Sequence, residues 1–203
     1  MSTQHIRVAV TAPILISFLL SGCGLMENLL GTSEPRRIDS IEPQSNTSFD
    51  SGASGLGQNI RSDDGEVQIS LPSSWRQIDG LHRNAEIQAA RESNDLYTLV
   101  LAEDKANLDK FTLENNATTY RRLLIAGLDQ FVEETPTEAN SVNNNNAVQY
   151  VIEGVYEGVP ITYLHSTVAT QRAYYQIISW TDSDRFEDNR DEFEQIAESF
   201  REN

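Results

Sequence analysis

The stretch that decides the fold is Tyr174-Tyr-Gln-Ile-Ile-Ser-Trp180. Its apolar and aromatic side chains occupy both odd and even positions, and successive side chains of a strand point to opposite faces of a sheet. Such a strand has to be covered on both faces. Residues 96–102 have the same character. Together the two stretches predict a sheet that is buried between two layers.

Shorter patterns predict the remaining strands. Apolar and polar residues alternate in residues 67–71 and 85–89, and residues 148–156 and 161–169 are expected to form two further strands. Alternation of this kind is typical of half-buried strands. Pro72 ends the first segment, because proline cannot donate to a strand ladder. Glu157-Gly158 predicts a tight hairpin between the last two segments. Short connections of this type favour antiparallel pairing.

Two helices are predicted by apolar residues spaced three or four positions apart. The first runs from Leu113 through Leu128 to Phe131, with Thr112 as its N-cap. The second follows Asp184, which with Glu187 forms an N-terminal capping signature. Its buried stripe contains Phe186, Phe193, Ile196, Ala197 and Phe200, and its acidic residues, Glu192, Glu194 and Glu198 among them, are assigned to the solvated side. The expected fold class is therefore α+β, a three-layer α/β/α sandwich with an antiparallel sheet of about six strands and one helix on each face.

The two ends of this region resemble PsbP-like domains. Val67-Gln-Ile-Ser-Leu-Pro-Ser-Ser-Trp75 is similar to their opening strand followed by Leu-Pro-x-x-Trp, and residues 174–200 resemble their closing strand and helix. The resemblance spans residues 66–202 and implies the same sandwich. Members include lumenal subunits of photosystem II, bacterial lipoproteins and a eukaryotic Ran-binding protein, so the fold does not imply one function. Ile69 and Leu71-Pro72 stand where photosynthetic members have an aromatic strand and Tyr-Pro, which favours the lipoprotein branch.

The N-terminal residues predict export. Arg7 precedes a short apolar run, and small residues follow it, as in a secretory signal peptide. Leu20-Ser-Gly-Cys23 resembles the lipobox of bacterial lipoproteins. That resemblance implies removal of residues 1–22, a diacylglycerol on Cys23 and a fatty acyl chain such as palmitate on its amine. The alternative is an ordinary signal peptide with an incidental cysteine.

Residues 23–64 are expected to form the lipidated Cys23 and a disordered tether, because serine, glycine, asparagine and acidic residues dominate there. Residues 65–203 are expected to form the PsbP-like domain. The chain carries a formal net charge of −16 and is repelled by nucleic acid and by anionic headgroups. Attachment to the membrane is therefore assigned to the acyl chains on Cys23. Gly24 favours the periplasmic side of the outer membrane, and the thylakoid lumen applies if the host is photosynthetic.

The sequence offers little for catalysis. It contains no Gly-x-Ser-x-Gly nucleophile motif and no phosphate-binding glycine loop. Its one cysteine is assigned to lipid, and the spacing of His82 and His165 does not require a metal site. We therefore expect no catalytic residue, no metal site and no cofactor. An enzyme with an unrecognised site is the weakest of the alternatives.

The leading functional hypothesis is a lipid-anchored extracytoplasmic binding or assembly module that contacts an envelope or membrane-complex protein and is not an enzyme. The alternative is a PsbP-type auxiliary lumenal subunit of photosystem II in a photosynthetic bacterium. The expected contact surface lies around Trp75 and His82. There a strand ended by Pro72 runs into a loop, and the indole of Trp75 is expected at a sheet edge, where it would anchor a partner.

Overall fold

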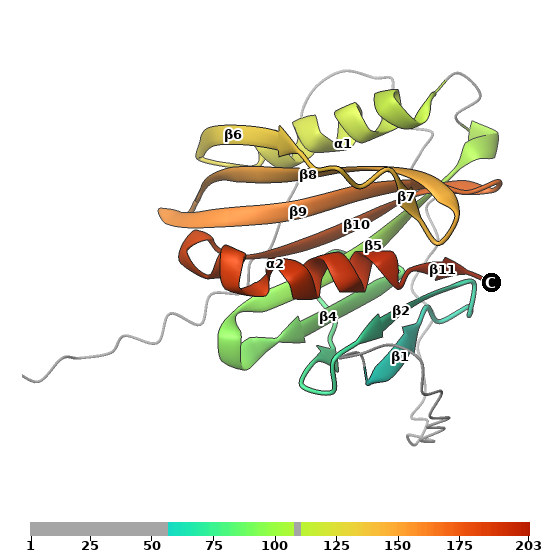
Figure 1. Cartoon of the computed structure of the whole chain (residues 1–203), viewed down its shortest axis with the longest axis horizontal. Coiled ribbons are helices and arrows are strands. Elements are labelled where there is room, and N and C mark those ends of the chain that lie inside the picture. Colours follow the sequence, from blue (N-terminus) through green and yellow to red (C-terminus); the bar gives the residue numbers. More distant parts are fainter. Residues whose placement is uncertain (1–56, 108–110) are drawn as a thin grey trace, which may run out of the picture.

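A computed structural model describes residues 57–107 and 111–203. Its main element is an eight-stranded antiparallel sheet that carries one helix on each face (Figure 1). Seven strands lie in the order β3-β4-β5-β10-β9-β8-β6, and β7 also pairs with β8. They are β3 (Arg76–Gln77), β4 (Ile87–Arg91), β5 (Leu96–Asp104), β6 (Gln130–Pro136), β7 (Ser141–Val142), β8 (Asn145–Tyr156), β9 (Val159–Ala169) and β10 (Ala173–Asp182).

The central strands are buried on both faces, as residues 96–102 and 174–180 predicted. β10 lies between β5 and β9. Its Tyr175 and Ile177 join the core beneath helix α2 (Ser183–Glu198), whereas Ile178 and Trp180 join the core beneath helix α1 (Leu113–Ala126). The fold class expected from the sequence, an antiparallel sheet between two helices, is confirmed.

A second, three-stranded sheet lies beside the C-terminal end of α2 (Figure 1). Its order is β1-β2-β11, from β1 (Gln58–Arg61), β2 (Val67–Leu71) and β11 (Arg201–Glu202). The sequence placed residues 67–71 in the main sheet, and this is wrong. Val67, Ile69 and Leu71 are buried instead in the core that also contains Phe193 and Ile196 of α2, which β2 contacts. The small sheet therefore extends the layer that contains this helix.

The predicted end of the tether also needs correction. Residues 58–61, which the sequence assigned to the tether, form β1 and pair antiparallel with residues 68–71 of β2. Gln58 Nε2 donates to the carbonyls of Pro72 and Trp75 at 3.1 and 2.9 Å. The polar composition of residues 58–61 did not indicate this strand, because backbone and side-chain hydrogen bonds and the single apolar residue Ile60 hold it to the domain.

Local signals placed the helix starts and the hairpin with mixed success. Thr112 caps α1 as predicted, accepting from the backbone N–H of Asn115 at 3.2 Å. α2 begins two residues earlier than the capping signature at Asp184 indicated, because β10 runs into it without a loop. Its N-cap is Asp182, which makes no side-chain capping bond. Glu157 and Gly158 form the expected hairpin turn, both with positive φ, 49° and 79°.

The first helix is shorter than its apolar stripe predicted. α1 ends at Ala126, and Phe131 lies in β6 with 44% of its surface exposed. The backbone N–H of Asp129 already donates to the carbonyl of Val155 at 2.8 Å. Backbone hydrogen bonds to β8 therefore take the place of the hydrogen bonds that would have continued the helix beyond Ala126. No signal in residues 128–136 had predicted a strand.

Three sequence predictions lie wholly or largely outside the described residues: the signal peptide of residues 1–22, the lipidation of Cys23 and the disordered tether as far as residue 56. Within residues 57–107 and 111–203, neither helix has the length and apolar composition needed to cross a membrane.

Candidate functional site

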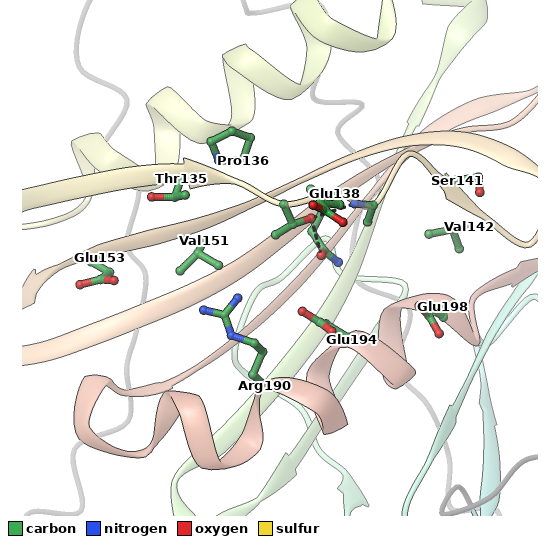
Figure 2. A pocket seen from close by; sticks show the side chains of 13 residues that line it. Thr135, Pro136, Glu138, Ser141, Val142, Val151, Glu153, Arg190, Glu194 and Glu198 are labelled. Carbon is green, nitrogen blue, oxygen red and sulfur yellow. Dashed lines mark hydrogen bonds between the residues drawn. The ribbon is translucent and has the colours of Figure 1, made fainter.

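A groove of about 540 Å³ lies on the α2 side of the sheet, between that helix and the connection from β6 to β7 (Figure 2). It exists because α2 packs over β9 and β10 and leaves this face of β8 uncovered. Gln149, Val151 and Glu153 of β8 line the groove. These residues are two positions apart and therefore share one face of the sheet.

The two walls come from segments far apart in the sequence. Arg190, Glu194 and Glu198 follow one another at intervals of four residues and therefore lie along one side of α2. Figure 2 shows Arg190 and Glu194 pointing from the helix toward the sheet. Residues 135–142, including Glu138, form the opposite wall. Val142 and Val151 are buried and add apolar surface between the walls.

Acidic groups dominate the groove. Glu138, Glu153, Glu194 and Glu198 line it, and none of them has an ion-pair partner among the described residues. Arg190 is the one basic lining residue. Its guanidinium binds Glu187, outside the lining, at 2.7 and 3.2 Å. The groove therefore holds a surplus of negative charge.

The pKa of the Glu194 carboxyl reflects this surplus of negative charge. Burial raises the pKa of its carboxyl, and the charges of Asp191, Glu198 and Glu187 raise it further, whereas Arg190 lowers it. A carboxylate with a raised pKa gains from a cation placed beside it, because that cation compensates for lost hydration and for repulsion.

The β6–β7 wall is held by a polar chain that reaches into the sheet. Thr137 Oγ1 donates to Gln149 Oε1 at 2.9 Å, and Gln149 Nε2 donates to Ser166 Oγ at 2.9 Å. The backbone of Ala139 donates to Thr137 Oγ1 at 3.2 Å. Gln149 and Ser166 are buried. Buried polar groups that are satisfied in this way keep a fixed geometry, so this side of the groove is preorganised.

A second polar cluster lies beneath α1. His165 Nε2 and Gln176 Oε1 are 2.8 Å apart, and Gln176 Nε2 donates to Asn116 Oδ1 at 2.7 Å. Asn116 in turn donates to Glu103 Oε2 at 2.6 Å. His165 is completely buried, and this burial lowers the pKa of its imidazole to about 4. A neutral imidazole within such a chain ties α1 to β5, β9 and β10.

The structure contradicts the predicted exposure of Trp75. Its side chain is 0% exposed and packs edge-on against Phe193 of α2, with the ring centroids 6.4 Å apart. The indole N–H donates to Glu192 Oε1 at 2.6 Å. Pro72 ends the strand as expected, but the turn after it folds inward beneath α2. Trp75 is a core residue and presents no indole to a partner.

His82 is half-buried in the loop between β3 and β4. Its backbone N–H donates to Gln88 Oε1 at 2.8 Å, and its Nδ1 accepts from the backbone of Asn84 at 3.2 Å. Burial lowers the pKa of its imidazole, and Arg83 lowers it further. Leu81, its neighbour, belongs to the core on the α1 side, whereas Trp75 belongs to the core on the α2 side. Because Trp75 is fully buried, the two predicted contact residues do not form a shared exposed surface.

Sequence reasoning missed the groove. Glu194 and Glu198 were assigned to the solvated side of a helix, Glu153 lay within a predicted strand without a functional role, and Glu138 belonged to no pattern. The spacing of four residues from Arg190 to Glu198 was the one available signal, and it shows a shared helix face without showing what lies opposite. No group of three or more His, Cys, Asp or Glu residues within the described chain is arranged to hold a metal ion. The groove is suited to attracting positive charge along its length.

Neither a known family profile nor a curated protein matches the sequence. Among solved structures, the chain is similar to cyanobacterial PsbP (CyanoP) from Synechocystis sp. PCC 6803, at 16% identity and a TM-score of 0.49, over 78% of this chain and 98% of that one. It is also similar to LpqN of Mycobacterium tuberculosis, which is involved in cell envelope biogenesis, at 15% identity and a TM-score of 0.46, over 70% and 88% of the two chains. A protein of unknown function from Pseudomonas aeruginosa, PA94, is similar at 8% identity and a TM-score of 0.42, over 72% and 96%. Likeness of this degree concerns the architecture and assigns no activity.

Proposed function

We propose that this protein is a lipid-anchored, non-enzymatic binding module on the extracytoplasmic side of a membrane, and that it holds a basic segment of a partner protein in the groove between α2 and the β6–β7 connection. The observation that carries the proposal is the set of four glutamates around one groove, none with an ion-pair partner among the described residues. Opposite charge on the partner would speed association and exclude acidic competitors.

The spacing of the acidic groups favours an extended partner. Glu194 and Glu198 are four residues apart on α2, a rise of about 6 Å. An extended chain advances about 6.6 Å every two residues. Lysine or arginine side chains at alternate positions of an extended segment would therefore be spaced to lie opposite the carboxylates of Glu194 and Glu198. Pro136, which is exposed, and Ala139, which is half-buried, supply apolar contact for the lysine stems.

The proposed anchor rests on the first residues of the chain. Leu20-Ser-Gly-Cys23 has the form of a lipobox, and lipid on Cys23 would hold the domain at a membrane surface. Replacing Cys23 by serine is expected to abolish fatty-acid labelling and to release the protein into the soluble extracytoplasmic fraction. Unchanged labelling of the Cys23→Ser protein would refute the anchor and leave the groove proposal standing.

The groove is tested with a fluorescent peptide of alternating lysine and threonine. The double substitution Glu194→Gln and Glu198→Gln is expected to weaken binding about tenfold, because each partly exposed ion pair contributes about 0.5–1 kcal/mol. The matched control is Asp188→Asn with Glu92→Gln, which removes the same charge from exposed positions that do not line the groove. Equal affinity of the two double variants would show that overall charge alone attracts the peptide, and the groove would be rejected.

A further inference from the structure

The strand β6 forms one end of the main sheet. It pairs with β8 on one side, and no strand of the described chain pairs with its other side. All seven of its residues, Gln130–Pro136, are exposed. An edge strand of this kind presents a row of backbone N–H and C=O groups that another extended chain can use.

The two faces of β6 differ in chemistry. Phe131 lies opposite Gly154 of β8, on the face covered by α1, and it is 44% exposed. Glu133 lies opposite Glu153, which lines the groove on the α2 face. A bulge between Phe131 and Glu133 includes Val132, which is 53% exposed.

Glu134 lies opposite Ile152, on the same face as Phe131, and its carboxylate binds Arg121 of α1 at 3.0 Å. The α1 face of the edge therefore offers the apolar ring of Phe131 beside a compensated carboxylate. The other face offers Glu133, which has no ion-pair partner among the described residues.

The edge disfavours a second copy of this chain. Two antiparallel β6 strands would bring Glu133 and Glu134 of each copy toward the same residues of the other, in a protein of net charge −16. Like charges placed opposite one another across two strands are destabilising. The bulge and Pro136 further limit pairing to a short stretch. The charge of this edge opposes an acidic strand, whereas a basic strand would turn the repulsion into attraction.

We propose that β6 accepts an added strand from the partner, and that this strand alternates basic and apolar side chains. Its basic face would lie beside Glu133 and continue toward the acidic groove, with which β6 shares Thr135 and Pro136. Its apolar face would cover Phe131. This inference rests on the proposed function in taking the same basic partner, and it adds the backbone pairing and the alternation of side chains.

The test uses a peptide of alternating lysine and valine and two forms of it, one N-methylated at every lysine and one at every valine. In an extended chain the two sets of N–H groups point to opposite sides, so only one set can face β6. We expect one methylated form to bind about tenfold more weakly or worse and the other to bind like the parent. Hydrogen exchange of the amides of residues 131–135 should slow when the parent peptide binds.

Two variants of the protein complete the test. Phe131→Ser is expected to lower the affinity for the parent peptide several-fold. Val159 lies two strands inward from β6 and is 47% exposed, and Val159→Ser is expected to leave that affinity unchanged. Equal binding of both methylated forms, without slower exchange in β6, would overturn strand addition while the basic-segment proposal stands. Failure of the unmodified alternating peptides to bind at all would refute the proposed function itself.

Discussion

The indole N–H of Trp75 donates to Glu192 Oε1 at 2.6 Å, and Arg91 binds the other oxygen of the same carboxylate at 3.0 Å. One glutamate on α2 therefore joins the turn after β2 to the strand β4. The contact turns an acidic residue, half-buried, from a helix side that the sequence assigned to solvent toward the sheet. Asn189, one turn earlier on α2, accepts from the same arginine at 2.7 Å, so α2 is fixed to the sheet by polar as well as apolar contacts.

Replacing Glu192 by alanine is expected to lower the free energy of unfolding by about 2 kcal/mol, because it leaves the buried N–H of Trp75 without an acceptor and removes one of the two acceptors of the Arg91 guanidinium. Urea unfolding measures the loss, and Glu187→Ala, at an exposed position of the same helix, is the control. In a Trp75→Phe background the cost should shrink, since that protein has no indole N–H to leave unpaired. An undiminished cost there would mean that the Trp75 contact contributes nothing.

His165 should make the protein sensitive to acid. Burial lowers the pKa of its imidazole to about 4 in the folded state, from an ordinary value of about 6.5 in the unfolded chain. The unfolded state therefore binds a proton first as the pH falls, and stability is lost progressively between about pH 6.5 and pH 4. From pH 7 to pH 5 this loss amounts to about 2 kcal/mol.

The measurement compares urea unfolding of the wild type and His165→Gln at both pH values. Glutamine keeps hydrogen-bonding capacity but cannot titrate, so the variant should lose about 2 kcal/mol less on acidification, whatever its stability at pH 7. His82→Gln serves as the control for a half-buried histidine. Parallel pH profiles for wild type and His165→Gln would contradict the assignment of this acid sensitivity to His165.

Gly154 is required where β8 passes the end of α1. A Cβ at this position would lie 2.5 Å from Leu128 Cδ1 and 2.6 Å from the carbonyl oxygen of Gln130. Gly154→Ala should therefore destabilise the protein by about 1–3 kcal/mol. Gly57→Ala, whose Cβ would meet nothing closer than 3.4 Å, should have little effect.

Adding Leu128→Ala to Gly154→Ala separates the two contacts at this site. The backbone carbonyl of Gln130 remains in place, so the double variant should stay less stable than Leu128→Ala alone. Thermal unfolding of the four proteins decides between these outcomes. Full recovery in the double variant would show that only the flexible leucine opposes a side chain at Gly154.

The N-terminal boundary of the domain can be tested by deletion. A chain that begins at Gly57 should fold as stably as the full mature chain, whereas one that begins at Asp63 should lose about 1–3 kcal/mol. The second chain lacks β1, the bonds from Gln58 to the carbonyls of Pro72 and Trp75, and the contact of Ile60 with the core. Identical melting of the two chains would restore the boundary at residue 64 that composition indicated.

Removal of the C-terminal helix should be far more damaging. A chain ending at Trp180 lacks Phe186, Phe193, Ile196 and Phe200, each no more than 2% exposed. At about 1.5–3 kcal/mol for each buried side chain, the loss exceeds half of a typical stability of about 5–15 kcal/mol. Circular dichroism should show no cooperative transition, and a retained one would contradict the central role of α2 in the core.

The sequence by itself determined the features that depend on neighbouring residues. The Glu157-Gly158 turn could be predicted because glycine readily adopts the positive φ that a tight hairpin needs. The Thr112 cap could be predicted because its hydroxyl lies three residues before the backbone N–H of Asn115 that it accepts from. The composition of residues 96–102 and 174–180 required two covering layers, because a strand with apolar side chains on both faces cannot leave either face in water. These local rules were sufficient for the fold class and for the buried stripe of α2.

Tertiary structure alone decided the features in which distant segments compete for the same partners. Residues 128–131 continue the apolar spacing of a helix, yet Phe131 lies in β6 because the backbone there pairs with the edge of β8. Trp75 has the surroundings of an exposed turn residue, yet Glu192, 117 positions later, satisfies its indole and allows its burial. The groove depends on α2 leaving β8 uncovered, so its acidic residues meet only after the layers have packed. Spacing along the chain records which side chains share a face, but the surface opposite that face is supplied by another part of the fold.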